Sequence, residues 1–227
     1  MTTITNPVTK DKEKEKKKPA VVIAAPKIEQ IQVRITGNAP YMQARFSQKA
    51  MNAMMEKMDG TVKAGSAKGK RAARDFDDDF EQAKHVSTEG WIGIPAGSIR
   101  AAIISACRLV GFKMTLAKLS VFVMADGYDR VDGQPLVRIY GEPERSDMAV
   151  RNATGVFDIR VRPKWSEWYA EPRISYDADQ FSLEDLLNLI RRVGLQVGLG
   201  EGRPDSRSSA GLGFGTFVVS DAGTEPK

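Results

Sequence analysis

Two runs of alternating glycines near the carboxyl end hold the residues best suited to bind an anion. They comprise Gly198, Gly200 and Gly202, then Arg203 and Arg207, and finally Gly211, Gly213 and Gly215. Glycine allows close approach of another backbone, and free amides in such loops cradle phosphates. Guanidinium groups bind phosphates through paired hydrogen bonds. This stretch therefore predicts contact with a polyanionic backbone.

A second basic segment covers residues 60–74 and is rich in Gly, Ala and Ser. Its cations are Lys63, Lys68, Lys70, Arg71 and Arg74. Flexible cations can follow a phosphate backbone without reading its sequence. A surface insertion that contacts nothing is an equally good interpretation, because long irregular loops are either functional or disordered.

Few other residues suggest chemistry. Asp75, Asp77, Asp78 and Asp79 offer the oxygen ligands that hard cations prefer, but we favour a solvated patch or a charge partner for the basic loop. His85 is the only histidine, and Cys107 is the only cysteine and lies in an apolar stretch. We therefore predict no catalytic residue, metal or cofactor. A metal-dependent or His85-dependent ribonuclease is the enzymatic alternative.

The totals describe a globular chain with a basic amino end. The 227 residues are 41% hydrophobic and carry a net charge of +5, of which Lys10–Lys18 contributes +3. We expect residues 1–26 to be a disordered arm, either solubilising or bound to nucleic acid, and residues 221–227 to be a flexible tail. No apolar run is long enough for a membrane helix or a secretory signal, so we expect a cytoplasmic protein without a membrane partner.

The first half of the chain predicts a strand and a helix. Residues 28–36 alternate between apolar and polar side chains, as in a half-buried strand. Ser47 is a good cap for a helix that ends near Gly60. Four methionines fall on one face of that helix, which favours a role in the core over an adaptable binding surface. They are Met51, Met54, Met55 and Met58.

The second half predicts two further helices among short strands. One helix begins at Gly97 or Ser98 and runs to Val110, and the other covers residues 183–193, capped by Ser182 and ended by Gly194. Strands are expected at residues 119–124, 135–140, 156–162 and 173–176, and at the end of the glycine-rich stretch. Trp165 and Trp168 suggest core anchors or, with Tyr169, a base-stacking surface. Arg34, Arg160 and Arg162 would form a basic face on the sheet.

This order predicts an α+β fold of the ferredoxin-like β-α-β…β-α-β type. It is an antiparallel sheet with helices on one face, in a single domain of residues 27–220. A long basic insertion lies near residues 60–90.

Two segments together resemble the repeat-associated mysterious protein superfamily, whose RNA-recognition-motif-like members include backbone subunits of CRISPR effector complexes. Residues 94–108 (IPAGSIRAAIISACR) resemble the family's element that turns from a loop into a helix, and residues 197–219 resemble its glycine-rich loop. The resemblance implies a modified ferredoxin-like fold and binding of an RNA backbone. It points to Ser98 and Arg100 in the first segment and to the glycines and Arg203 in the second.

These observations predict a non-catalytic protein that binds the backbone of single-stranded nucleic acid, preferably RNA, and that assembles along the strand. A structural subunit of a larger assembly, with self-association or other protein subunits as partners, is the alternative.

Overall fold

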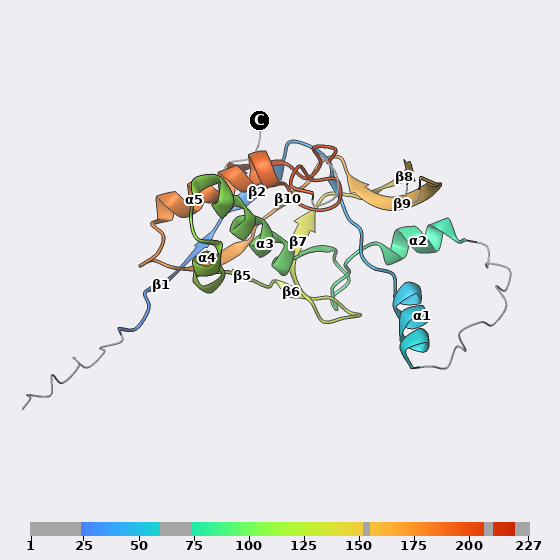
Figure 1. Ribbon diagram of the computed structural model, residues 1–227, viewed down its shortest axis with the longest axis horizontal. Helices are drawn as coiled ribbons and strands as arrows, with labels where there is room; N and C mark the ends of the chain where they lie inside the picture. The colour runs from blue at the N-terminus through green and yellow to red at the C-terminus, as the bar shows by residue number, and fades with distance from the viewer. Residues whose placement is uncertain (1–23, 60–73, 152–154, 207–210, 221–227) are drawn as a thin grey trace, which may run out of the picture.

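The chain has an α+β architecture in which every pair of strands is antiparallel (Figure 1). A computed structural model describes residues 24–59, 74–151, 155–206 and 211–220. No helix within these ranges has the length and apolar character required to cross a bilayer. The predicted tail and most of the predicted arm and of the basic loop lie outside the described residues.

Two continuous chain segments each pass through two neighbouring sheets. The first contains β1 (Ile28–Gln32) and β2 (Arg34–Gly37), and the second contains β10 (Tyr169–Ala170) and β11 (Arg173–Asp177). β1 pairs with β11 and β2 pairs with β10. At the junction, the amide of Val33 donates to the carbonyl of Pro172 at 3.2 Å. Two sheets are thereby joined through one pair of segments.

The remaining strands extend this centre on both sides. β5 (Val121–Met124) pairs with β11, β7 (Pro135–Tyr140) with β10, and β12 (Phe217–Ser220) with β2. β4 (Gly93–Pro95) and β6 (Gly127–Tyr128) pair with β7. The larger sheet therefore has the order β12-β2-β10-β7-β4.

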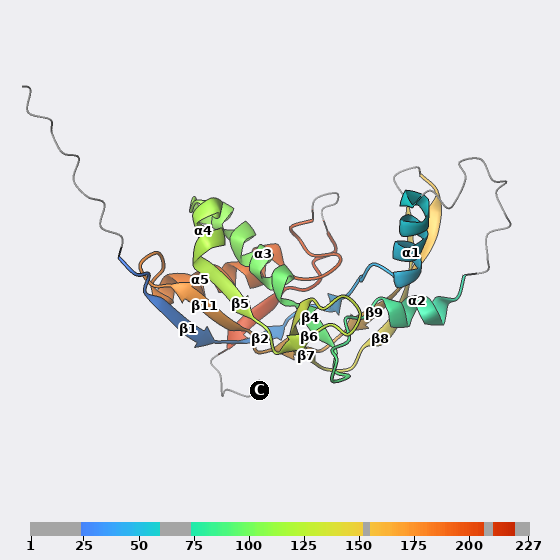
Figure 2. The same ribbon diagram turned by 90° about the horizontal axis from the view of Figure 1, so that it is seen from below.

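Three helices cover one face of these sheets (Figure 2). They are α3 (Ala96–Ala106), which continues as the short 3-10 helix Cys107–Val110, α4 (Met114–Ser120) and α5 (Leu183–Arg192). Ile99 and Ile103 of α3 pack into the same core as Leu186 and Ile190 of α5. The turn Val193–Val197, which leads into the glycine-rich stretch, contacts both α3 and β12.

A β-ribbon and two helices extend from one end of this body (Figure 2). The ribbon consists of β8 (Glu144–Arg151) and β9 (Phe157–Trp165), with β3 (Tyr41–Met42) beside β9. α2 (Phe76–Gln82) packs on β9, whereas α1 (Gln48–Met58) has no buried residue.

Several local predictions are confirmed. Ser47 and Ser182 cap α1 and α5 through hydrogen bonds from the amides of Ala50 and Asp185. The alternating segment at residues 28–36 forms β1 and β2. Trp165 and Trp168 are buried, with 0% and 3% exposure, as core anchors.

Other predictions are wrong at helix ends. α3 begins at Ala96, directly after Pro95, and so earlier than the predicted start at Gly97 or Ser98. α5 does not end at Gly194 but continues as a π-helical turn, Val193–Val197, to Gly198. Gly194 is needed for another reason, since a Cβ there would overlap the carbonyl oxygen of Phe217 in β12.

The prediction that the α1 methionines fill the core is also wrong. Met54, Met55 and Met58 are 56%, 52% and 86% exposed. Their spacing is that of an amphipathic helix, but the part of the chain that the structure describes leaves most of the apolar face exposed. The sequence analysis did not predict α2, α4 or β8, and it placed Leu119 and Ser120 in a strand, whereas they end α4.

Candidate nucleic-acid interface

A cavity of about 700 Å³ separates α3 from the glycine-rich stretch. Both segments that carry the family resemblance contribute to its walls, although about a hundred residues separate them in the chain. The polar and charged lining residues are Gln43, His85, Ser98, Ser105, Lys118, Glu201, Arg203 and Asp205. Tyr41, Met114, Val197 and Leu199 are among the apolar ones.

The amino end of α3 borders the cavity through Pro95 and Ser98. Pro95 supplies no side-chain cap for the helix, so the amides of the first turn receive no side-chain hydrogen bond there. The Ser98 side chain is exposed. Uncapped amides and the positive end of the helix dipole favour an anion. This end of the cavity therefore suits a phosphate group.

The glycine-rich stretch is folded tightly against the chain itself. A Cβ at Gly200 would overlap the carbonyl oxygen of Met42, and one at Gly211 would overlap that of Arg203. Gly198 and Gly202, like Gly200, Gly211, Gly213 and Gly215, have positive φ. Only at Gly213 would a Cβ meet no atom within 4 Å. Most of these glycines thus allow protein backbones to approach one another, and only Gly198 and Gly200 line the cavity.

Arg203 and Lys118 supply positive charge to the cavity. Both side chains are exposed, and among the described residues neither forms a salt bridge. Arg203 donates to the carbonyl of Gly200 at 3.1 Å, which orients its guanidinium beside the loop. Lys118, on α4, lines the same cavity. Two cations, one from α4 and one from the glycine-rich stretch, therefore line the same cavity.

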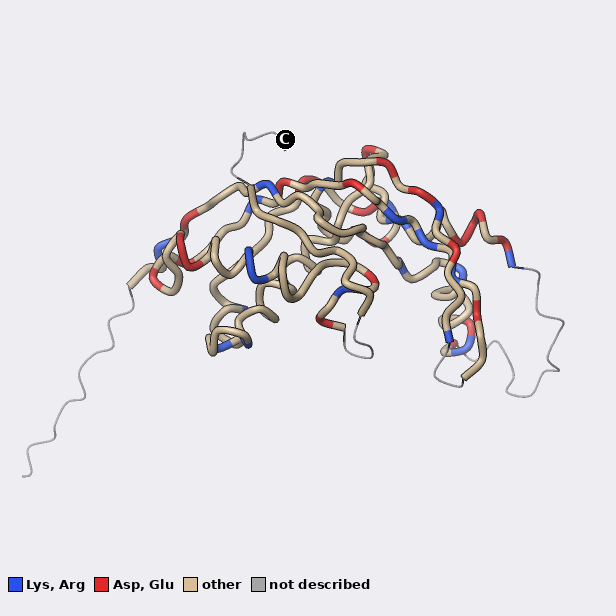
Figure 3. Tube along the Cα trace, turned by 90° about the horizontal axis from the view of Figure 1, so that it is seen from above, with Lys and Arg blue, Asp and Glu red and all other residues tan. Residues whose placement is uncertain are grey.

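Arg160 and Arg162 do not extend a free basic face across the sheet. Their guanidinium groups bind the carboxylate of Glu201, at 3.2 and 2.7 Å. Arg34 is likewise paired, with Glu171 at 3.1 Å. Figure 3 shows basic and acidic positions interspersed along the ribbon, in agreement with such pairing.

Two further arginines predicted to bind nucleic acid have intramolecular partners. Arg100 donates from Nε to the carbonyl of Val121 at 2.8 Å, which ties α3 to β5. Arg74 bridges Asp79 and Asp158. The acidic patch accordingly pairs with arginines, and Asp75 caps α2, so these carboxylates have structural partners instead of forming a metal site.

Asp205 anchors the glycine-rich stretch to α3. It accepts hydrogen bonds from Ser105 and from Arg108, the latter at 2.8 Å. The hydrogen bonds from Ser105 and Arg108 lower the pKa of Asp205. Asp205, one of the two acids that line the cavity, is thus already paired with Arg108 of the segment that continues α3 and is less repulsive to an anion.

His85 contributes to the cavity from a buried network. Its Nδ1 lies 2.9 Å from Oδ2 of Asp129, and the Arg45 guanidinium lies 3.5 Å from the other oxygen of that carboxylate. Burial lowers the pKa of His85 in spite of the Asp129 carboxylate. Asp132 joins the cluster, but Arg45 already supplies its positive charge. The set fits a structural ion-pair network better than a metal centre.

The structure brings together only part of the predicted site. Ser98, Gly198, Gly200 and Arg203 share the cavity. Lys63, Lys68, Lys70, Arg71 and Arg207 lie outside the described residues. Sequence reasoning missed Lys118, Tyr41 and Gln43, because α4 and the segment after β2 carried no motif. A search of the chain against models of protein families and against curated proteins finds no match.

Proposed function

We propose that this protein binds the backbone of single-stranded nucleic acid, preferably RNA, in the cavity between α3 and the glycine-rich stretch, without cleaving it. The observation that carries the proposal is the meeting of Arg203, Lys118 and the uncapped amino end of α3 around one hollow. All three are donors suited to phosphate. The apolar walls can accommodate a sugar or base, since nucleic-acid sites combine cations with apolar surface.

We also propose a ferredoxin-like fold of the repeat-associated mysterious protein type. Support comes from the chain order β1/β2, α3, β5/β7, β10/β11, α5, β12, which alternates strands and helices as in a split β-α-β arrangement. The positions of residues 94–108 and 197–219 on facing walls of one cavity are compatible with that family's way of holding RNA.

A binding titration of the double variant Arg203→Ala/Lys118→Ala, which we call the cavity variant, tests the function. Fluorescence polarisation with a labelled single-stranded oligonucleotide should show binding by the wild type that weakens with salt. For the variant we expect the slope of log K against log [salt] to fall by about 1.4, because each phosphate contact on a single strand contributes about 0.7. The matched control Lys27→Ala/Arg191→Ala removes two cations that do not line the cavity and should keep the slope.

Absence of binding to any single-stranded oligonucleotide at low salt would refute the proposal. An equal decrease of the salt slope in the cavity variant and in the control would mean that the net charge of the protein, and not the cavity, binds the nucleic acid.

One observation favours a second candidate, a ribonuclease that uses His85. The imidazole lines the same cavity, and Asp129 holds Nδ1, so Nε2 is the nitrogen left to accept a proton. Incubation of labelled RNA with wild type and with His85→Asn, each with chelator, separates the candidates. Cleavage by the wild type alone supports the enzyme, and intact RNA in both samples rejects it.

A further inference from the structure

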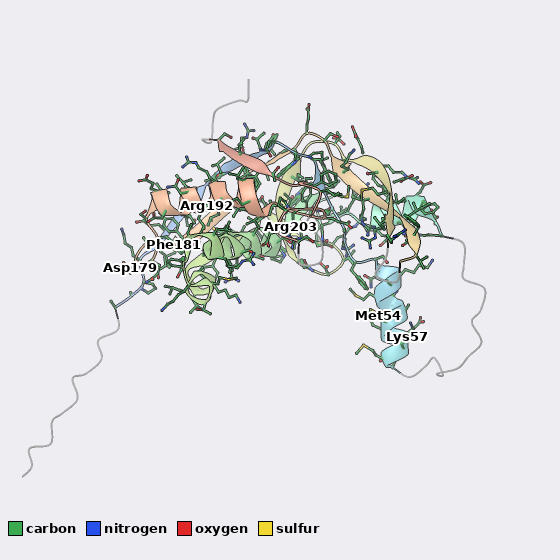
Figure 4. All side chains as sticks on the ribbon, turned by 45° about the horizontal axis from the view of Figure 1, so that its top comes forward. Met54, Lys57, Asp179, Phe181, Arg192 and Arg203 are labelled. Carbon is green, nitrogen blue, oxygen red and sulfur yellow. The ribbon has the colours of Figure 1, made fainter. Side chains whose placement is uncertain are left out.

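A second cavity lies between α5 and the turn that follows the 3-10 helix after α3. Its volume of about 450 Å³ is in the range of sites that hold small molecules, and we call it the Phe181 cavity. Figure 4 shows Phe181 and Arg192, which line it, and Arg203, which lines the cavity described above. The two cavities share no lining residue, so the Phe181 cavity is a separate site.

Aromatic rings form the apolar part of the Phe181 cavity. The rings of Phe112 and Phe181 lie 4.7 Å apart, and Val110 and Leu189 also belong to this part of the wall. Phe181 and Leu189 are each 5% exposed and are held in the core, whereas Phe112 is half-buried. A flat ring system can pack on such a surface, because aromatic side chains hold other rings by stacking.

The polar part of the wall is one face of α5. Asp185, Asn188 and Arg192 follow one another at spacings of three and four residues, which places them on the same side of the helix. Asp185 Oδ2 accepts a hydrogen bond from Ser182 at 2.6 Å, whereas Oδ1 has no partner among the described residues. Asn188 Oδ1 accepts from Arg191 at 3.0 Å, so the amide nitrogen of Asn188 is left to donate. The helix thus offers the cavity one acceptor and one donor.

Arg192 adds a positive charge at the other end of this face. Within the ranges that the structure describes it has no salt bridge, and its Nη1 makes only a long hydrogen bond of 3.4 Å to Gln196. Seven residues separate Arg192 from Asp185, which corresponds to about 10 Å along the helix axis. A guanidinium group with free N–H groups binds a phosphate through paired hydrogen bonds.

The positions of these groups distinguish between ligand classes. A free aromatic amino acid would have to place its ammonium group at Asp185 and its carboxylate at Arg192, but these two groups lie only about 3 Å apart in an amino acid. The span of about 10 Å on α5 suits a ligand with a planar ring at one end and an anion at the other. A purine nucleoside monophosphate has this arrangement, because its base carries N–H donors and acceptors and its phosphate lies beyond the ribose.

We propose that the Phe181 cavity binds a purine nucleoside monophosphate. The base packs against the Phe112 ring, Asp185 Oδ1 accepts a hydrogen bond from an N–H group of the base, and the Asn188 amide donates to a base acceptor. Arg192 binds the phosphate. This inference does not rest on the proposed function, since no residue that lines the first cavity takes part.

Isothermal titration calorimetry on the nuclease-treated full chain tests the phosphate contact, with GMP, AMP, guanosine and inorganic phosphate as separate titrants. We expect GMP, AMP or both to bind at one site per chain, and guanosine and phosphate to bind more weakly. Arg192→Ala should raise the Kd of the nucleotide about tenfold or more, because charge-assisted hydrogen bonds are lost, and should leave the Kd of guanosine unchanged. The matched control Arg130→Ala removes an exposed cation outside the cavity and should leave every Kd unchanged.

Asp185→Asn tests the base contact. The hydroxyl of Ser182 donates to this side chain, so the amide oxygen keeps that hydrogen bond and the amino group replaces the acceptor Oδ1. The Kd of the nucleotide should rise about tenfold or more, because a donor would then meet the N–H group of the base, and the Kd of inorganic phosphate should not change. Circular dichroism and thermal unfolding show that each variant is folded.

Three results would overturn the proposal. They are no measurable binding of GMP or AMP at millimolar concentration, equal effects of Arg192→Ala and of the control, and loss of nucleotide binding in the cavity variant Arg203→Ala/Lys118→Ala, which would place the nucleotide in the first cavity. The outcome is separable from that of the proposed function, because Arg192→Ala should keep the salt slope of oligonucleotide binding. A protein that binds oligonucleotides but neither nucleotide would reject this inference alone.

Discussion

Leu199 and Gly215 hold the two arms of the glycine-rich stretch together backbone to backbone. The amide of Leu199 donates to the carbonyl of Gly215 at 2.9 Å, and a Cβ on Gly215 would overlap the carbonyl oxygen of Leu199. The close approach that this glycine permits is therefore to the protein itself. Nucleic acid, in our proposal, meets the loop at Gly198, Gly200 and Arg203 instead.

Gly215→Ala should destabilise the protein more than Gly213→Ala does. Both positions have positive φ, at 67° and 74°, but only Gly215 faces backbone atoms. We expect Gly213→Ala to cost about 1–2 kcal/mol from left-handed strain alone. Overlap adds about 1–3 kcal/mol more for Gly215→Ala. Urea unfolding measures both, and equal losses would contradict the packing described for Leu199.

Glu201→Gln should tighten binding to single-stranded nucleic acid. The change releases Arg160 and Arg162 from a carboxylate that lines the cavity, and it removes a negative charge from the wall. The salt slope should become steeper by up to about 0.7, equivalent to one additional phosphate contact. Glu184→Gln makes the same charge change at an exposed position on α5, away from the cavity. Polarisation titrations showing identical effects in the two variants would argue against a role for Glu201.

Arg100→Ala should reduce stability and leave binding unchanged. Its guanidinium ties α3 to the carbonyls of Lys118 and Val121, and loss of charged hydrogen bonds of this kind costs about 1.5 kcal/mol. Thermal unfolding measures the loss, and polarisation at low temperature measures binding by the folded variant. A weakened salt slope at unchanged stability would instead restore Arg100 to the nucleic-acid site.

His85 should make stability depend on pH in a defined direction. Because burial lowers its pKa in the folded chain, the unfolded chain binds the proton first. The contribution of neutral His85 is complete above the unfolded pKa of about 6.5 and is lost as pH falls toward the folded value, at no more than about 1.4 kcal/mol per pH unit.

His85→Asn isolates this contribution, since the amide can still donate to Asp129 but does not titrate. As the pH is lowered from about 8 to about 5, the urea midpoint of unfolding should fall more steeply for the wild type than for the variant. Parallel curves would show that the imidazole is not desolvated as described.

Local features were predictable from sequence because they depend on neighbours in the chain. The caps at Ser47 and Ser182, the alternation in β1 and β2, and the burial of Trp165 follow from propensity and pattern. The shared cavity of Ser98 and Arg203 was anticipated only through the family resemblance, and Lys118 was not anticipated at all. Its position depends on how α4 packs, which no local pattern encodes.

The errors have a common physical origin in long-range pairing. A count of arginines predicted a basic face, but Glu201 reaches Arg160 and Arg162 across some forty residues of chain. An amphipathic period predicted that Met54 and Met58 would be buried, because periodicity reveals an apolar face and not what covers it. Gly194 looked like a helix end, whereas its lack of a side chain serves the contact with Phe217.

The absence of buried residues in α1 has a consequence for its amide hydrogens. A segment with few buried contacts opens without global unfolding, so its protons exchange with solvent at a rate set by local opening alone. In a dilute monomer the amides of α1 should exchange far ahead of those in β1, β11 and α3.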